Sequence, residues 1–142
     1  MQEDGFSGQA SRPYLEQTPE GLTLIGKEGR LRGDFSSLIT RITPRNLPGE
    51  LPVKACKLKT EDPNRLPTLW DATAGLGEDS FLLAASGFSV TMYEYDETVA
   101  ALLADALARS AAVPELAPVI SRMRLLAEDS VNAMRKAKKE GV

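Results

Sequence analysis

The 142-residue sequence contains no histidine and a single cysteine, Cys56. Without histidine, neither a Ser–His nor a Cys–His catalytic pair can form, and the commonest ligand of transition metals is missing. One cysteine cannot close an internal disulfide, which is typical of proteins kept in a reducing compartment. We therefore exclude these catalytic pairs, expect no metal site, and expect a cytoplasmic location.

The sequence shows no long apolar run, and we expect no secretory leader. The apolar stretches are far shorter than a membrane span, and residues 1–5 show no basic region followed by an apolar one. Hydrophobic residues make up 42% of the chain and charged residues 26%, a composition typical of a soluble globular domain. The length suffices for one domain with a core, and we expect no membrane contact.

Two phosphate-binding motifs are absent from the most informative turn of the chain. Residues 69–77 read Leu-Trp-Asp-Ala-Thr-Ala-Gly-Leu-Gly, an apolar strand that runs into an acid and then into a loop with Gly75 and Gly77. A dinucleotide fingerprint needs a third glycine three residues after Gly77, where this chain has Ser80. A P-loop needs a Gly-Lys-Ser/Thr string, which the chain lacks.

What this turn has instead is an acid, Asp71, placed just before two glycines. The glycines allow a positive φ and let a ligand approach the main chain, next to the free N–H groups of the following helix. Such a strand–loop–helix turn holds a nucleotide-like cofactor at the C-terminal edge of a parallel sheet. Asp71 would repel a pyrophosphate, whereas S-adenosylmethionine (SAM) carries an ammonium and a sulfonium group and no phosphate. The alternative for Asp71 is a turn or cap residue.

The sequence divides near Pro67 into segments 1–66 and 67–142. Residues 1–20 are polar and contain two prolines, which predicts a loose lead-in. Short strands are predicted at residues 22–25 and 38–42, and a linker at residues 61–67. From residue 68 strands alternate with helices, which predicts a parallel, doubly wound sheet. The expected strands are residues 68–73, 88–94 and 123–127, and the expected helices are residues 79–86, 97–110 and 130–140. The predicted fold class is α/β, a Rossmann-like sheet of about three parallel strands after a small β-containing N-terminal segment.

Two further acids follow the second and third predicted strands. Glu94 comes about twenty residues after the glycine loop, where an acid accepts hydrogen bonds from ribose hydroxyls, and Asp96 is its competitor or a helix cap. Asp129 follows the third strand at a place from which it could reach an adenine amino group, with Glu128 as the alternative. Each acid alone could be a solvated loop carboxylate, but three successive strand ends with acids favour a cofactor site.

The string Asp-Ala-Thr-Ala-Gly-Leu-Gly at residues 71–77, followed by Asp79, resembles the bacterial small-subunit ribosomal RNA (guanine-N2-)-methyltransferase family of class I SAM enzymes. Similarity continues upstream at residues 18–22, 33–35 and 53–55, and extends over nearly the whole chain from about Thr18. In the second helix it lies at Ala100, Ala101, Leu102, Leu103, Asp105, Leu107, Ala108 and Arg109. The resemblance implies a class I methyltransferase fold, SAM as cofactor, and ribosomal RNA of the small subunit as substrate.

Residue by residue, the resemblance places Asp71, Gly75 and Gly77 around the methionine moiety, Glu94 on the ribose and Asp129 near the adenine. Ala72 and Thr73 complete the expected cofactor site. The family has a basic, glycine-rich stretch where this chain has the less basic residues 43–50. Its Asp-Pro-x-Phe-Pro-type catalytic motif follows a fourth strand, and no residue of this chain matches it. We therefore assign no catalytic residue and expect the cofactor-binding half of a longer enzyme, either a truncated piece or a natural short form.

Residues 21–59 carry eight Lys and Arg against three acids, in a chain whose net charge is −3. These cations are Lys27, Arg30, Arg32, Arg41, Arg45, Lys54, Lys57 and Lys59. The segment fits contacts with RNA phosphates, or it is an ordinary solvated surface. Two other hypotheses are a non-catalytic cofactor-binding or interaction module and a nucleotide-dependent oxidoreductase. The sequence leaves the oligomeric state and the target nucleotide open.

Overall fold

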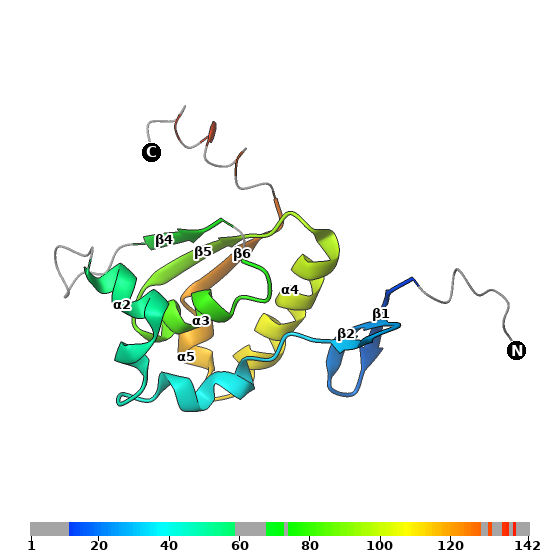
Figure 1. Ribbon diagram of the computed structural model, residues 1–142, viewed down its shortest axis with the longest axis horizontal. Helices are drawn as coiled ribbons and strands as arrows, with labels where there is room; N and C mark the ends of the chain where they lie inside the picture. The colour runs from blue at the N-terminus through cyan, green and yellow to red at the C-terminus, as the bar shows by residue number, and fades with distance from the viewer. Residues whose placement is uncertain are drawn as a thin grey trace, which may run out of the picture.

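The computed structural model describes residues 12–58, 68–72, 74–128, 131, 135, 136 and 138. Within them the chain forms an antiparallel sheet, β1–β2–β3, and a parallel sheet, β4–β5–β6 (Figure 1). The strands are β1 (Tyr14–Thr18), β2 (Gly21–Gly26), β3 (Gly29–Leu31), β4 (Thr68–Asp71), β5 (Ser89–Tyr93) and β6 (Met123–Leu126). The helical elements are the 3-10 helices η1 (Phe35–Ile42) and η2 (Leu47–Gly49) and the α-helices α2 (Leu51–Leu58), α3 (Glu78–Ala85), α4 (Glu97–Ala111) and α5 (Ala117–Ile120).

The parallel sheet confirms the predicted α/β class. Leu69 pairs with Val90, and Val90 pairs with Met123, all in parallel register. The strands expected at 68–73, 88–94 and 123–127 and the helices expected at 79–86 and 97–110 all occur, with ends that differ by at most two residues. None of the described helices is long and apolar enough to cross a membrane. The expected linker at 61–67 and most of the helix expected at 130–140 lie outside the described residues.

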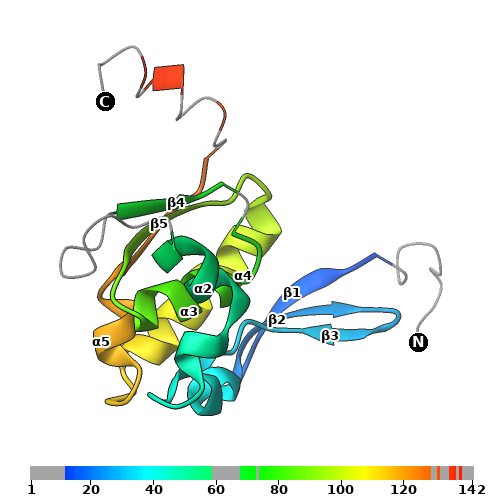
Figure 2. The ribbon, with the colours of Figure 1, turned by 60° about the vertical axis from the view of Figure 1, so that its left-hand side comes forward.

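Helices α2 to α5 lie on one side of the parallel sheet (Figure 2). Val90 and Met92 point from β5 into the core beneath these helices, with exposed fractions of 2% and 0%. Strand alternation places Trp70 and Tyr93 on the opposite face, where their ring centroids are 5.3 Å apart. The sheet therefore presents two different faces, one sealed by helices and one carrying an aromatic pair.

The N-terminal segment shares the core of the parallel sheet. Phe35 from η1 stacks on Phe81 from α3, with ring centroids 5.0 Å apart and planes 12° apart. Leu38 from η1 and Val53 from α2 are buried in the same cluster. The division of the chain near Pro67 stays a prediction.

The strand predicted at residues 38–42 is wrong, because Phe35–Ile42 forms the 3-10 helix η1. Asp34 precedes this helix and accepts a hydrogen bond from the Ser36 N–H at 3.0 Å, which caps its first turn. Phe35 and Leu38 then fall on one side, since side chains three residues apart line up in a 3-10 helix. Burial of this pair in the core outweighs the β propensity of the isoleucines and threonine.

The loose lead-in predicted for residues 1–20 is also wrong in its described part. Residues Tyr14–Thr18 form β1, which pairs antiparallel with β2 from Tyr14↔Ile25 to Thr18↔Gly21. Only one of these strands, residues 22–25, carries an apolar signal, and β1 becomes a strand because β2 supplies its hydrogen-bonding partner. Strand β3 and helices α2 and α5 were not predicted, for they are short and contain or follow Gly and Pro residues.

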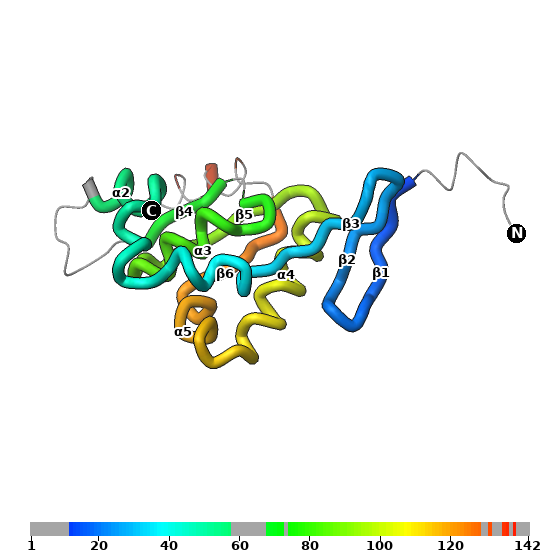
Figure 3. Tube along the Cα trace, turned by 60° about the horizontal axis from the view of Figure 1, so that its bottom comes forward, coloured from blue at the N-terminus to red at the C-terminus, as the bar shows by residue number. Residues whose placement is uncertain are grey.

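The antiparallel sheet is fastened to the side of α4, at one end of the molecule (Figure 3). The Asp105 Oδ2 atom accepts hydrogen bonds from the Leu22 N–H at 2.9 Å and from Arg109 Nε at 2.7 Å. Arg109 Nη2 donates to the Gly33 carbonyl at 2.5 Å. Burial works against the charge on Asp105, but these two hydrogen bonds and the positive charges of Arg109 and Arg32 outweigh it and lower its pKa.

We predict that Asp105→Asn lowers the free energy of unfolding by about 1–2 kcal/mol at neutral pH, because it weakens two charge-assisted hydrogen bonds. Since folding lowers the pKa of Asp105, its contribution is complete above the ordinary carboxyl pKa of about 4 and is lost as the pH falls through the lower folded value. Urea unfolding at neutral pH and at about pH 3 measures both effects.

The control for this prediction is Glu115→Gln, since Glu115 is exposed and its side chain makes no hydrogen bond to another described residue. The difference in unfolding free energy between wild type and Asp105→Asn should be smaller at low pH than at neutral pH. The unfolding free energy of Glu115→Gln should stay close to that of wild type at both pH values. A gap that is constant with pH would contradict the assignment.

Candidate functional site

The turn between β4 and α3 contains the predicted glycines in positive-φ backbone conformations. Gly75 has φ +57° and Gly77 has φ +79°, both in the left-handed region that favours glycine. The Gly77 N–H donates to the Ala74 carbonyl at 2.9 Å, and the Gly77 carbonyl accepts from the Phe81 N–H at 2.8 Å. The positive φ expected for both glycines is confirmed.

The two glycines have different structural roles. A Cβ on Gly77 would lie 2.8 Å from Leu103 Cδ1 and 3.3 Å from Phe35 Cζ, so its main chain is pressed against the core. A Cβ on Gly75 would meet nothing within 4 Å. Gly77 therefore serves packing, and Gly75 is the glycine whose main chain is open to a ligand.

The turn is joined to the end of β5 by two hydrogen bonds. The Ala74 N–H donates to the Tyr93 carbonyl at 3.0 Å, and the Gly75 N–H donates to Glu94 Oε1 at 2.9 Å. Glu94 Oε2 accepts from the Asp96 N–H at 3.1 Å. Each carboxylate oxygen has a second lone pair, so Glu94 can hold the loop and still accept from a ligand.

Asp96, the competitor of Glu94, caps α4. Its Oδ1 atom accepts a hydrogen bond from the Val99 N–H at 3.0 Å, which satisfies one of the free donors at the helix start. Glu128 is exposed just after β6. Thr73 and Asp129 lie outside the described residues, so the choice between Glu128 and Asp129 stays open.

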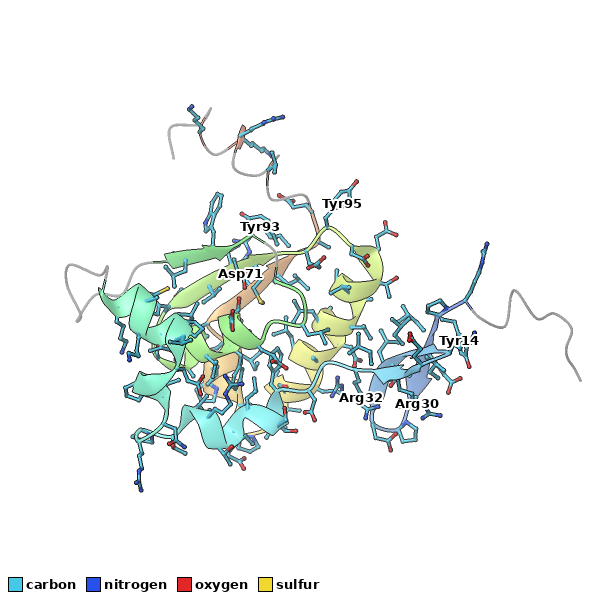
Figure 4. The ribbon with its side chains drawn as sticks, viewed as in Figure 1. Tyr14, Arg30, Arg32, Asp71, Tyr93 and Tyr95 are labelled. Carbon is cyan, nitrogen blue, oxygen red and sulfur yellow. The ribbon has the colours of Figure 1, made fainter. Side chains whose placement is uncertain are left out.

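Asp71 ends β4 beside α3 (Figure 4). Its Oδ2 atom accepts a hydrogen bond from Ser80 Oγ at 2.5 Å, and Ser80 is fully buried. The residue that replaces the third glycine of a dinucleotide fingerprint thus ties the helix to the acid. Sequence reasoning missed this contact, although position 80 lies on the turn of α3 that faces the strand.

A cavity of about 260 Å³ lies between α2 and β4 and includes Asp71 and Ala72 in its wall. Asp79 adds a second carboxylate, and Leu69, Leu83 and Val90 supply apolar surface. Two residues of α2, Pro52 and Cys56, close the other side. The cavity therefore combines an acidic end with apolar walls, which is a setting for a cation that also carries hydrocarbon.

The fold and this turn define a class of protein: a Rossmann-like domain whose first strand–loop–helix turn is acidic, with no pyrophosphate fingerprint. Comparison with known sequences narrows the class. Residues 7–141 match the family described as "putative SAM-dependent methyltransferase", and the chain belongs to this family.

The chain is similar to ribosomal RNA small subunit methyltransferase J of Neisseria gonorrhoeae, with 37% identity over 82% of this chain and 45% of that protein. It is 48% identical to the protein of the same name from Pseudomonas aeruginosa over 51% of this chain and 28% of that one. The crystal structure of a SAM-dependent methyltransferase from N. gonorrhoeae superimposes with a TM-score of 0.76 and 32% identity, over 92% of this chain and 52% of that one. The chain thus spans half or less of the length of these curated relatives.

We predict that Gly77→Ala destabilises the fold by about 2–5 kcal/mol, because left-handed strain adds to overpacking against Leu103 and Phe35. Gly75→Ala should cost only the strain, about 1–2 kcal/mol, since its Cβ points into open space. Urea unfolding of the two variants compares the positions directly. Equal losses would contradict the packing role of Gly77.

Proposed function

We propose that the turn at residues 71–77 binds SAM and that the chain is the cofactor-binding part of a methyltransferase. The observation that carries the proposal is the acidic cavity at Asp71, together with the open main chain of Gly75 in the same turn, in a member of this family. An acidic wall attracts the ammonium and sulfonium groups of SAM and repels a pyrophosphate. When bound, SAM supplies a methyl group on a positively charged sulfur.

The residues that would hold SAM fall into three groups. Asp71, with Asp79 in the wall of the same cavity, would supply negative charge for the methionine end, and the main chain of Ala72, Thr73, Gly75 and Gly77 would lie along it. Glu94 is already oriented by two N–H groups, and its remaining lone pairs suit two ribose hydroxyls. Asp129, or Glu128 in its place, would reach the adenine amino group. Asp71 and Glu94 follow neighbouring parallel strands, so both lie at the same sheet edge.

We further propose that the substrate is ribosomal RNA of the small subunit and that the acceptor is guanine N2. The relatives' names support the first part, and the resemblance of residues 71–77 supports the second. The protein's contribution to such a transfer is to hold acceptor and methyl group in a productive orientation. A cytoplasmic location agrees with this substrate.

Calorimetric titration with S-adenosylhomocysteine and with nicotinamide adenine dinucleotide tests the cofactor. We expect binding of S-adenosylhomocysteine alone, whereas binding of the dinucleotide alone would favour the oxidoreductase. The alternative of a non-catalytic binding module predicts cofactor binding without transfer. Incorporation of labelled methyl groups into small-subunit RNA by this chain would exclude that module.

We predict that Asp71→Ala abolishes measurable binding of S-adenosylhomocysteine, because it removes the negative charge at the cavity. Gly75→Val should have the same effect, since a β-branched side chain does not suit φ +57° and would cover the open main chain. Both are measured by isothermal titration calorimetry, with thermal melts to verify that the variants are folded.

Ser80→Ala is the matched control for Asp71→Ala. It removes the hydrogen bond to Asp71 and keeps the carboxylate, so binding should weaken by about tenfold or less. Normal binding by folded Asp71→Ala would show that the site is misplaced.

A further inference from the structure

Among the described cations of the N-terminal segment, some make hydrogen bonds or ion pairs within the fold and others do not. Arg32 Nη1 donates to Thr23 Oγ1 at 3.0 Å, next to the Asp105 cluster. Arg41 forms a fork with Glu50, with Nε to Oε2 at 3.0 Å and Nη2 to Oε1 at 2.7 Å. Glu50 is the one acid in the sequence between residues 35 and 60. Both of its oxygens accept hydrogen bonds from Arg41, and none of the side chains of Arg45, Lys54 and Lys57 bonds to it.

Two of these cations, Lys54 and Lys57, form what we call the α2 basic face. Both are exposed, and neither side chain makes a hydrogen bond or ion pair to another described residue. Lys54 and Lys57 are three residues apart and so share one side of α2. With Pro48 and Val53 they line a shallow groove of about 290 Å³. The groove therefore has apolar walls and two free ammonium groups.

The α2 basic face lies next to the proposed cofactor site. Pro52 and Cys56, on the inner side of α2, line the same cavity as Asp71. The lysines lie on the outer side of α2. The α2 basic face and the cavity are therefore separated by about one helix diameter, roughly 10 Å. Two other exposed cations, Lys27 and Arg30, lie on the antiparallel sheet at the far end of the molecule, where Figure 4 labels Arg30 well away from Asp71.

We propose that the α2 basic face binds the phosphate backbone of the substrate RNA and so sets it beside the methyl donor. The inference rests on the proposed function for its substrate class. The two exposed ammonium groups suit phosphates, and the exposed ring of Pro48 suits the face of a ribose or base. The net charge of −3 makes this cationic face a local feature of the chain, and it is adjacent to the site that would receive the target base.

The test compares two double variants that remove two positive charges each. Lys54→Ala/Lys57→Ala removes the α2 lysines, and Lys27→Ala/Arg30→Ala is the matched control. Fluorescence anisotropy measures the affinity for a labelled RNA hairpin from the small-subunit RNA as salt is varied. The α2 variant should lose about tenfold or more at 0.1 M salt, and its slope of log affinity against log salt should fall by about 1.4–1.8. The control should stay within about twofold of wild type.

Binding of S-adenosylhomocysteine is measured for wild type and for both variants. This measurement distinguishes a failure of the RNA face from a failure of the proposed function. If wild type does not bind the cofactor analogue but the α2 variant alone loses RNA, the proposed function fails and the RNA face stands. Three outcomes overturn the RNA face: no binding of the hairpin by wild type, an equal or larger loss in the control variant, or unchanged RNA affinity in the α2 variant. The last outcome, together with lost binding to phosphatidylglycerol vesicles, would assign the face to membranes instead.

Discussion

The close approach of Gly77 to Leu103 and Phe35 is the constraint on which the rest of the site depends. At this point the turn between β4 and α3, helix α4 and η1 meet with no room for a Cβ on Gly77. Phe35 also stacks on Phe81, one turn into α3, so the N-terminal segment supports the start of that helix. Because the core holds the turn at Gly77, the main chain at Gly75 can remain open.

Carboxylates give this open side its chemistry. Glu94 fixes the loop through the Gly75 N–H, and Ser80 fixes Asp71, so both acids are oriented before any ligand arrives. Preorganised charge lowers the cost of ordering a site on binding. The cations are divided in a similar way. Arg41 and Arg32 bond within the fold, while the α2 basic face stays available to a ligand.

The sequence predicted the elements whose signal is local and missed those that depend on partners. Residues 88–94 alternate with period two, and Asp96 precedes a long apolar helix face, so β5 and α4 follow from pattern alone. By contrast, η1 depends on burial of Phe35 and Leu38 under α3, and β1 depends on its pairing with β2. At the site, the motif predicts the positive φ of Gly75 and Gly77, which the structure confirms. The cofactor contacts of Asp71, from the motif, and of Glu94, from the end of the second strand, stay predictions. The sequence does not predict the contacts that orient these residues, because only the fold brings the partners together. These contacts are the hydrogen bond from Ser80 to Asp71 and the close approach of Gly77 to Leu103.

In our proposal, a cofactor with a cationic methionine end binds at the open side of this turn. The most direct measurement is a backbone amide NMR titration of the chain with S-adenosylhomocysteine, with assigned signals. We expect the largest shifts at Ala72, Gly75 and Glu94, and small ones at Lys27 and Arg30 on the distant sheet. Shifts confined to other parts of the chain, or none at saturating ligand, would contradict the account.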